Sequence, residues 1–444
     1  MSARTGFRLP HLLLPRRGVD LAKWAVIACD QYTSEPEYWQ RVERLVGDAP
    51  STLNLVFPEV HLGAPDAPAR IARIQRSMRA CLEAGLLEPH EGAVLVERTV
   101  EGRTRRGLML ELDLEHYDFS ANSTSLIRPT EGTIVSRLAP RIEVRREAEL
   151  ELPHILVLID DPERTVIEPI AAEVEARRAM QGPLYETDLM LGGGRVAGFA
   201  VDGRRAEAAC AALSALAEPA VVARRYDVPE GTPPMLFAVG DGNHSLATAK
   251  SIWEQAKARV GPDHPSRYAL VEVENIHDPA LHFAPIHRLL IGVGSDLRAA
   301  LAGHFGARLR LADVNGAEAM RAEVQAAEAR ADGSMQAVGI VEPGARFAVA
   351  RIAEPEASLS VGTVQAFVDD FMARGGAADV DYVHGDDTLE RLAQQAGHAG
   401  FHLGTVPKGE LLKRVMHDGP LPRKTFSMGE AHEKRYYVEA RRIR

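Results

Sequence analysis

Groups that could bind a phosphate and move a proton occur together in the segment Asp241-Gly242-Asn243-His244-Ser245. An apolar run precedes this segment and a helix-like stretch follows it. A strand would therefore deliver the carboxylate to a sheet edge, and the helix would present unpaired N–H groups to an anion. His244 could donate a charged hydrogen bond or move a proton near neutral pH, and Asp241 could hold a magnesium ion or position a hydroxyl group. The alternative is an ordinary Asp-Gly turn with Asn243 or Ser245 as a helix cap.

A second group of ionisable residues surrounds Glu131. Arg128 precedes this glutamate, and Arg137 and Arg141 follow it. Two or three guanidinium groups around one carboxylate could bind an anionic substrate in a fork geometry while Glu131 acts as a base. The alternative is a solvated turn held by exposed ion pairs, which are common and weak.

Charged residues near the C-terminal end offer further groups for an anion. Lys424 is followed by Glu430, His432 and Lys434. A charged surface tail is the usual explanation for such a run.

The histidine spacing does not predict a metal site. His277, His282 and His287 repeat every five residues, which matches neither a helix face nor a strand face. No carboxylate–histidine metal motif accompanies them. We therefore predict that these histidines hold no structural metal.

The elements that must position these residues alternate between strands and helices. Apolar runs predict buried strands, and apolar residues at helical spacing predict helices. The pattern favours an α/β (mixed α+β) fold in three parts, 1–120, 121–290 and 291–444, without a clear linker between them. Strands are predicted at 24–29, 155–159, 235–239 and 268–273, a hairpin at 93–100 and 107–114, and helices at 70–87, 167–181, 204–216, 246–256, 317–331 and 363–372.

Composition argues against several classes of protein. The 444 residues contain 52 lysines and arginines against 62 aspartates and glutamates, a net charge of −10, which argues against a dedicated nucleic-acid binder. The three cysteines are far apart, which excludes a disulfide framework and a four-cysteine zinc site. No apolar run approaches the roughly 20 residues of a membrane-spanning helix. Residues 1–18 resemble neither a signal peptide nor an anchor, so we expect a cytoplasmic protein without membrane contact.

Six stretches of the chain carry a family resemblance: 19–21, 29–32, 128–141, 153–169, 240–249 and 422–437. They resemble the domain of unknown function 1015 family over nearly the whole length of the chain. The commoner family form of the central motif is Asp-Gly-His-His-Arg, so Asn243 and Ser245 indicate a distinct subgroup. Together with a preceding glutamate, the motif is also similar to free-serine kinases with a ParB/sulfiredoxin-like fold. This resemblance implies such a fold for the central part, with α/β extensions on both sides.

The same resemblance implies roles for individual residues. Glu131 would be the base at the serine hydroxyl, and Asp241 and His244 would handle the phosphate or its metal. Mg²⁺ and ADP or ATP are the implied cofactors. Glu131 and Asp241 lie 110 residues apart, so an insertion must separate the two halves of the site. The expected phosphate- or substrate-binding residues are Gly242, Asn243, Ser245, Arg128, Arg137, Arg141 and Lys424, of which the last three could replace the missing arginine of the motif.

The expected function is phosphoryl transfer on serine or O-phosphoserine, linked to a nucleotide. The direction could be that of a serine kinase or of phosphoserine dephosphorylation in serine biosynthesis. Two alternatives remain: a non-catalytic regulator with a ParB-like fold that senses a nucleotide or metabolite, and a phosphoserine phosphatase that uses water. The main hypothesis requires Glu131 and Asp241 to converge beside His244 around one pocket.

Overall fold

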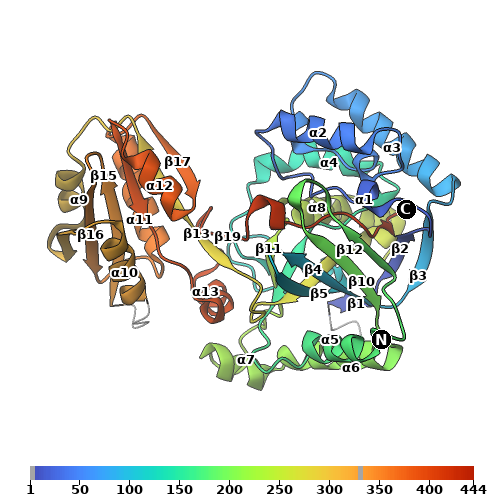
Figure 1. The fold of residues 1–444 in the computed structure, drawn as a ribbon. Helices are drawn as coiled ribbons and strands as arrows, with labels where there is room; N and C mark the ends of the chain where they lie inside the picture. Colours follow the sequence, from blue (N-terminus) through green and yellow to red (C-terminus); the bar gives the residue numbers. More distant parts are fainter. Residues whose placement is uncertain (1–5, 329–333) are drawn as a thin grey trace. The chain divides into compact units, whose positions relative to one another are not determined.

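The structure is a computed structural model, and it describes residues 6–328 and 334–444. They form two compact units, one containing the chain up to Leu281 together with Gly429–Arg444, and the other containing His282–Met428 (Figure 1). The fold is mixed α+β, as predicted. Strands from both sides of residue 120 pair within one sheet, so the first two expected parts form a single unit. The second unit begins at His282, and residues 429–444, expected in the third part, belong to the first unit.

The first unit contains one nine-stranded sheet and two short sheets. Its strands are β1 (Phe7–Arg8), β2 (His11–Pro15), β3 (Leu87–Glu91), β4 (Val94–Val100), β5 (Arg103–Asp113), β6 (Ile127–Pro129), β7 (Leu150–Glu151), β8 (Leu156–Ile159), β9 (Tyr185–Asp188), β10 (Arg195–Ala200), β11 (Phe237–Asp241), β12 (Tyr268–Asn275) and β20 (Arg441–Arg442). Its helices are α1 (Leu21–Trp24), α2 (Pro36–Val46), α3 (Ala67–Glu83), α4 (Leu138–Arg146), α5 (Ile167–Arg177), α6 (Gly203–Leu216), α7 (Pro219–Tyr226) and α8 (Asn243–Val260).

The strand order of the large sheet is β6-β11-β8-β12-β5-β4-β10-β9, with β1 added beside β5. β6 runs parallel to β11 and β8 runs parallel to β12, while the other pairs are antiparallel. β4 and β5 form the predicted hairpin. Glu101 and Gly102 connect them with positive φ values of 50° and 76°, the combination that a type I′ turn requires.

The apolar run at 24–29 is buried as predicted, but it is not a strand of the sheet. The Asp20 carboxylate accepts a hydrogen bond from the Ala22 N–H (3.1 Å) and caps α1, which draws Trp24 into a helix. Beyond α1 the chain is extended, and Ile27 makes one isolated bridge, to Tyr436. The apolar run therefore pairs with the C-terminal segment, which local periodicity does not reveal.

Two hydrophobic clusters pack against the large sheet. One joins its strands to α5, α6 and α8, and the other joins them to α2 and to residues 436–438 near the C-terminal end. Figure 1 shows α5 and α6 side by side. The helices α3, α5, α6 and α8 all occupy stretches in which helices were predicted.

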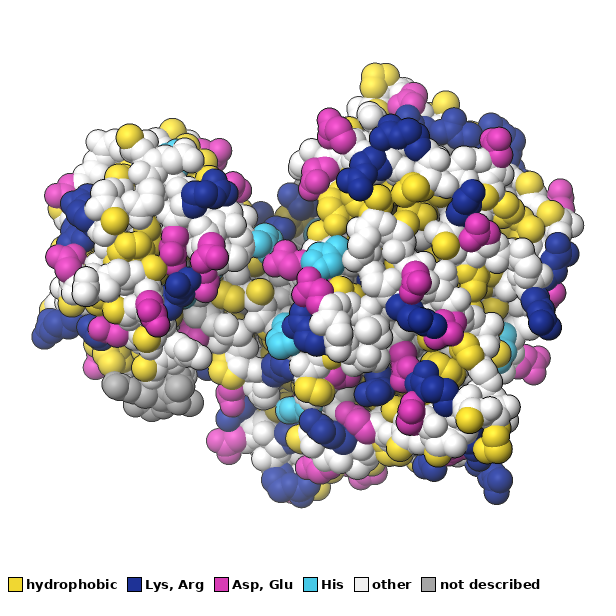
Figure 2. All heavy atoms as spheres, in the orientation of Figure 1, with side chains coloured by type: hydrophobic (Ala, Val, Ile, Leu, Met, Phe, Trp, Pro, Cys, Tyr) yellow, Lys and Arg dark blue, Asp and Glu magenta, His cyan; other side chains and the backbone are white. Residues whose placement is uncertain are grey.

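Helix α3 has one buried and one charged face. Ile74 and Met78 are buried, whereas Arg73, Arg76 and Arg79 are exposed at helical spacing. Figure 2 shows Lys and Arg side chains gathered over α2 and α3 on the face in view. This pattern is that of a surface helix whose apolar stripe faces the core.

The second unit is a sheet with helices on both faces. Its strands are β13 (Phe283–Ile291), β14 (Leu309–Val314), β15 (Met335–Glu342), β16 (Arg346–Ala353), β17 (Asp379–His384), β18 (His398–His402) and β19 (Phe426–Met428), and its helices are α9 (Leu297–Phe305), α10 (Ala317–Glu328), α11 (Ser360–Ala373), α12 (Asp386–Ala393) and α13 (Leu411–Asp418). The antiparallel strands take the order β14-β16-β15-β18-β13-β17, with β19 added beside β13. Helices α9 and α11 share one core with the sheet, and α10 and α12 share another.

The helices predicted at 317–331 and 363–372 correspond to α10 and α11, with residues 329–331 outside the described chain. Among the described residues, no single helix combines the length and the apolar composition needed to cross a membrane. The bent pair of α6 and α7 meets these two criteria only when its helices are taken together.

Candidate functional site

The turn from β11 into α8 forms the centre of the candidate site. β11 ends at Asp241, and Gly242 has a φ of 76° before α8 begins at Asn243. A Cβ on Gly242 would lie 3.0 Å from the backbone of Ile155, so both the positive φ and the close approach favour glycine. In the described chain no side chain caps α8, which excludes the predicted alternative of an Asn243 or Ser245 cap. The first N–H groups of the helix therefore remain available to an anion.

Parallel pairing brings Glu131 to the same sheet edge as Asp241. Pro129 of β6 lies opposite Val239 of β11, and the Thr130 N–H donates to the Val239 carbonyl oxygen (3.1 Å). Since the two strands run in the same direction, both end at this edge. Glu131 follows directly and is half-buried. The fold thus bridges the 110 residues that separate these two carboxylates in the sequence.

Lys434 supplies the positive charge nearest to Asp241. Its Nζ lies 3.1 Å from Oδ2 of Asp241, while Oδ1 accepts a hydrogen bond from the Gly242 N–H (2.9 Å). Burial would raise the pKa of Asp241, but Lys434, together with His154 and the Gly242 N–H, holds that pKa below its ordinary value. The sequence pattern indicated a charged surface tail around Lys434, whereas the side chain of this residue is only 11% exposed.

His154 connects three further groups of the site. The Tyr437 hydroxyl accepts a hydrogen bond from the Cys29 N–H (3.0 Å) and lies 2.8 Å from Nδ1 of His154. A hydroxyl can both donate and accept, so this contact fits either tautomer of His154. Nε2 lies 2.8 Å from the Ser245 Oγ and 3.8 Å from the Asp30 carboxylate. His154 therefore joins Ser245 to Tyr437 through hydrogen bonds at its two ring nitrogens.

His244 is neutral rather than charged near neutral pH. Burial, followed by the charges of Arg141 and Arg137, lowers its pKa from 6.5 to about 4. The Ile134 N–H points at Nε2 of His244 (3.4 Å), which places the ring proton on Nδ1. His244 was expected to donate a charged hydrogen bond. The structure instead gives a neutral imidazole whose Nδ1–H is the donor.

The three predicted arginines have different surroundings. Arg128 is buried and donates to backbone carbonyl oxygens at 2.7 to 3.5 Å, so its guanidinium holds the chain rather than facing an anion. Arg141 forms a bidentate pair with Glu59 (2.7 and 2.5 Å). Arg137 is exposed. Lys424 lies in the second unit, where its carbonyl oxygen accepts a hydrogen bond from a buried guanidinium (2.8 Å), and its role at an anion stays a prediction.

A cavity of about 130 Å³ lies beside the hydrogen-bonded group of His154, Ser245 and Tyr437. Ser245, His154 and Tyr437 line it together with the Arg141–Glu59 pair, and most of its other lining residues are apolar. Typical ligand pockets measure roughly 300–1,000 Å³. The cavity can therefore hold a small molecule or part of a larger one, but not a whole nucleotide.

The surroundings of Asp241 do not fit a magnesium ion. Both of its carboxylate oxygens are engaged, one by an N–H group and the other by the ammonium of Lys434. Mg²⁺ requires near-octahedral oxygen ligands at about 2.1 Å. A cation on Asp241 would have to displace Lys434.

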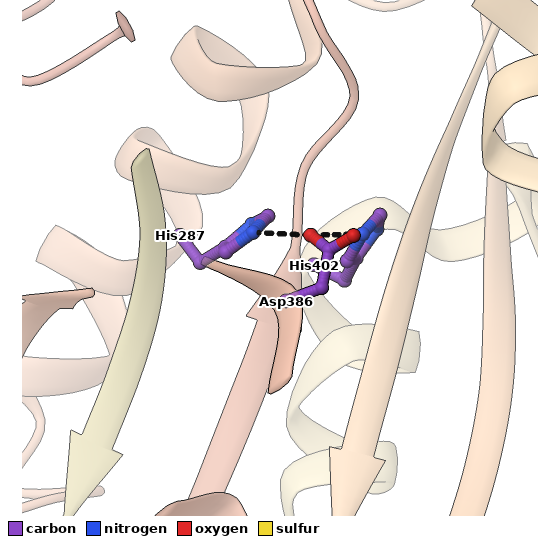
Figure 3. A group of neighbouring side chains, drawn as sticks. All are labelled: His287, Asp386 and His402. Carbon is purple, nitrogen blue, oxygen red and sulfur yellow. Dashed lines mark hydrogen bonds and ion pairs between the residues drawn. The ribbon is translucent and has the colours of Figure 1, made fainter. Parts of the chain in front are cut away.

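A second cluster of ionisable groups lies in the second unit (Figure 3). His287 on β13, Asp386 at the start of α12 and His402 at the end of β18 place possible metal ligands within 4.8 Å of one another. Oδ1 of Asp386 lies 2.9 Å from Nε2 of His287 and 3.1 Å from Nε2 of His402. The two rings stack with centroids 4.7 Å apart. The histidine spacing in the sequence could not reveal this group, because Asp386 and His402 lie far from His287 along the chain.

The hydrogen bonds of His287 argue against a metal in this cluster. The Leu403 N–H donates to Nδ1 of His287 (3.1 Å), so the ring proton lies on Nε2 and points at Asp386. A metal bound at Nε2 would require the opposite tautomer, in which the ring N–H and the Leu403 N–H would face each other. This geometry disfavours a metal at Nε2 of His287, and the expected absence of a structural metal stays a prediction.

Comparison with known proteins gives one family match. The model of the family described as "Protein of unknown function (DUF1015)" matches residues 13–371. No curated protein is significantly similar to the chain.

Several solved structures resemble the chain at 11% identity. Free serine kinase in complex with AMP covers 76% of this chain and 91% of its own, with a TM-score of 0.36. SbnI with a C-terminal truncation, from Staphylococcus aureus, covers 71% and 83% (TM-score 0.33). A conserved hypothetical protein from Pyrococcus furiosus covers 74% and 90% (TM-score 0.35). Similarities this low establish neither a shared function nor a shared fold.

Proposed function

The chain belongs to the DUF1015 family, and we propose that it transfers a phosphoryl group between O-phosphoserine, or serine, and a second substrate. One observation carries the proposal: the uncapped start of α8 lies beside the Asp241–Lys434 pair, at the sheet edge where β6 ends before Glu131. A helix N-terminus and a lysine both stabilise a phosphate dianion. A carboxylate at the same edge can exchange a proton with a serine hydroxyl.

Each residue of the site would have its own role in the reaction. The first N–H groups of α8 and the Ser245 hydroxyl bind the phosphoryl oxygens, with the neutral His244 as a further donor. Glu131 takes the proton from the serine hydroxyl when serine is phosphorylated, and returns it in the reverse reaction. These fixed donors stabilise the charge that spreads over the phosphoryl group during transfer.

The family resemblance is the reason for including a nucleotide in this proposal. The start of α8 and Lys434 could bind its phosphate groups, and they say nothing about its base or sugar. A bound nucleotide would supply the phosphate donor or acceptor. A cytoplasmic role in serine biosynthesis belongs to the same proposal. The steps assigned to Glu131, Ser245 and His244 do not depend on which second substrate is used.

Incubation of the purified protein with O-phosphoserine, with and without ADP and Mg²⁺, tests the proposal. We expect serine and ATP to form when ADP is present. Free phosphate without ADP would favour the phosphatase alternative. Intact O-phosphoserine that nevertheless raises the melting temperature would favour the sensor alternative. If the protein neither binds nor converts O-phosphoserine, the proposed function is wrong.

Glu131→Gln tests the assignment of the base. We expect a loss of turnover of about 10²-fold, in the range for a positioned acid or base. Glu83→Gln on the exposed face of α3 is the matched control, and it should keep full activity. Equal turnover in both variants would remove Glu131 from the mechanism.

A further inference from the structure

The C-terminal segment of the first unit brings a buried cation to the candidate site. Residues 429–444 return to this unit, and the Lys434 ammonium lies 3.1 Å from the Asp241 carboxylate. Lysine is rarely buried unless it is paired. Among the described residues, Asp241 is the one ionic partner of Lys434 that the structure shows. An ammonium has three N–H donors, so at least one stays available for a ligand.

Neighbouring residues hold the backbone of this lysine in place. Arg435 is buried and pairs with the carboxylates of Glu272 (2.7 Å) and Glu439 (2.8 Å). Tyr437 is fixed through its hydroxyl by the Cys29 N–H and by His154. Both anchors directly follow Lys434 and hold the backbone that carries it, while Asp241 holds its ammonium, which favours a fixed donor rather than a mobile surface charge.

We infer that Lys434 is a phosphate-binding residue that takes the place beside Asp241 where the family resemblance predicts a metal ion. The inference rests on the proposed function. Asp241 orients the ammonium through Oδ2, and the remaining N–H donors bind the oxygens of a phosphate monoester dianion together with the start of α8. The ligand class is therefore a phosphate monoester, such as O-phosphoserine, or inorganic phosphate.

Calorimetric titration with inorganic phosphate and with O-phosphoserine tests this role. Lys434→Met, which removes the charge at similar length, should weaken binding of both ligands about 10²-fold, by analogy with the loss of one preorganised donor. Lys434→Arg keeps the charge and should retain most of the affinity. Lys257→Met, at the exposed end of α8, is the matched control and should bind as the wild type does.

Two further variants separate folding from binding. Lys434→Met leaves Asp241 without its cation, so Mg²⁺ should bind there and partly restore phosphate affinity. The double variant Asp241→Asn/Lys434→Met removes both charges, should fold, and should show no rescue by Mg²⁺. Wild-type affinity in Lys434→Met, or a weakened Lys434→Met that Mg²⁺ does not rescue, would overturn the inference.

The outcome for the wild-type protein separates this inference from the proposed function. If the wild type binds phosphate but transfers none, the proposed function fails and the role of Lys434 in binding stands. If the wild type transfers phosphate and Lys434→Met does so equally well, only the role of Lys434 fails.

Discussion

The carboxylates of Asp241 and Asp386 occupy similar positions in their two units but have different surroundings. Asp241 ends a strand directly before a helix, and Asp386 begins a helix two residues after a strand. Asp386 accepts from two imidazoles, and the Leu403 N–H completes the bonding of His287, while the buried Nδ1 of His402 has no hydrogen-bond partner among the described residues. Around Asp241, in contrast, the start of α8 and part of the Lys434 ammonium keep unused donors. A group of ionisable residues therefore does not by itself identify a binding site. Hydrogen-bond donors that have no partner within the protein are the better indication.

Replacing Asp241 and Asp386 by asparagine, one at a time, should produce the largest difference in turnover between the two units. Asp241→Asn should lower phosphoryl transfer about 10²–10³-fold, because Lys434 loses the group that orients it. Asp386→Asn should leave turnover within error of the wild type. The measurement is O-phosphoserine turnover at saturating substrate. Equal losses in the two variants would mean that the second unit also takes part in the reaction.

Asp386→Ala should instead reduce stability. It removes the acceptor shared by two buried imidazoles, and each unsatisfied group costs roughly 1–3 kcal/mol, so we expect a loss of about 2 kcal/mol or more. All three tryptophans, Trp24, Trp39 and Trp253, lie in the first unit, so their fluorescence reports that unit alone.

In urea, the circular dichroism of Asp386→Ala should therefore show an early transition that tryptophan fluorescence does not follow. His384→Ala, on an exposed position of the neighbouring strand, is the control. An unchanged unfolding curve in Asp386→Ala would mean that the cluster of His287, Asp386 and His402 contributes nothing to stability.

The pH dependence of the first unit should reflect His244. The unfolded chain binds a proton at His244 near pH 6.5, whereas the folded chain does so only near pH 4. The contribution of His244 to stability is therefore fully present above about pH 6.5 and is lost as the pH falls toward 4. Melting followed by tryptophan fluorescence should show a smaller acid destabilisation in His244→Asn than in the wild type. Parallel pH profiles would contradict the lowered pKa.

Zinc should have the smallest effect of all. Because the tautomer of His287 opposes a metal at Nε2, Zn²⁺ should not raise the melting temperature of the second unit. His402→Ala, titrated in parallel, corrects for weak binding elsewhere on the surface. A rise that requires His402 would show that the Leu403 N–H gives way and that the cluster is a metal site.

The local part of the site could be predicted from the sequence. The strand before Asp241, the turn at Gly242 and the helix after it each have a local signal, namely an apolar run, a glycine and helical spacing. Lys434 and His154 lack such a signal because the fold brings them to Asp241 from distant parts of the chain. The polar run around Lys434 has the composition of a solvated tail, and only the burial of the residues that follow it, 435–438, distinguishes it from one. The lowered pKa of His244 likewise depends on burial and, after it, on two arginines, all of which tertiary structure provides.

The discontinuity of the first unit has a consequence for synthesis on the ribosome. The chain emerges with β11 and α8 first, then the whole of His282–Met428, and only afterwards Lys434 and Tyr437. Since proteins begin to fold from the N-terminus during translation, an unfinished chain can form most of the sheet while Asp241 still lacks its ammonium partner and His154 its phenol partner. A fragment released by a premature stop anywhere within the second unit would therefore contain the start of α8 without either partner.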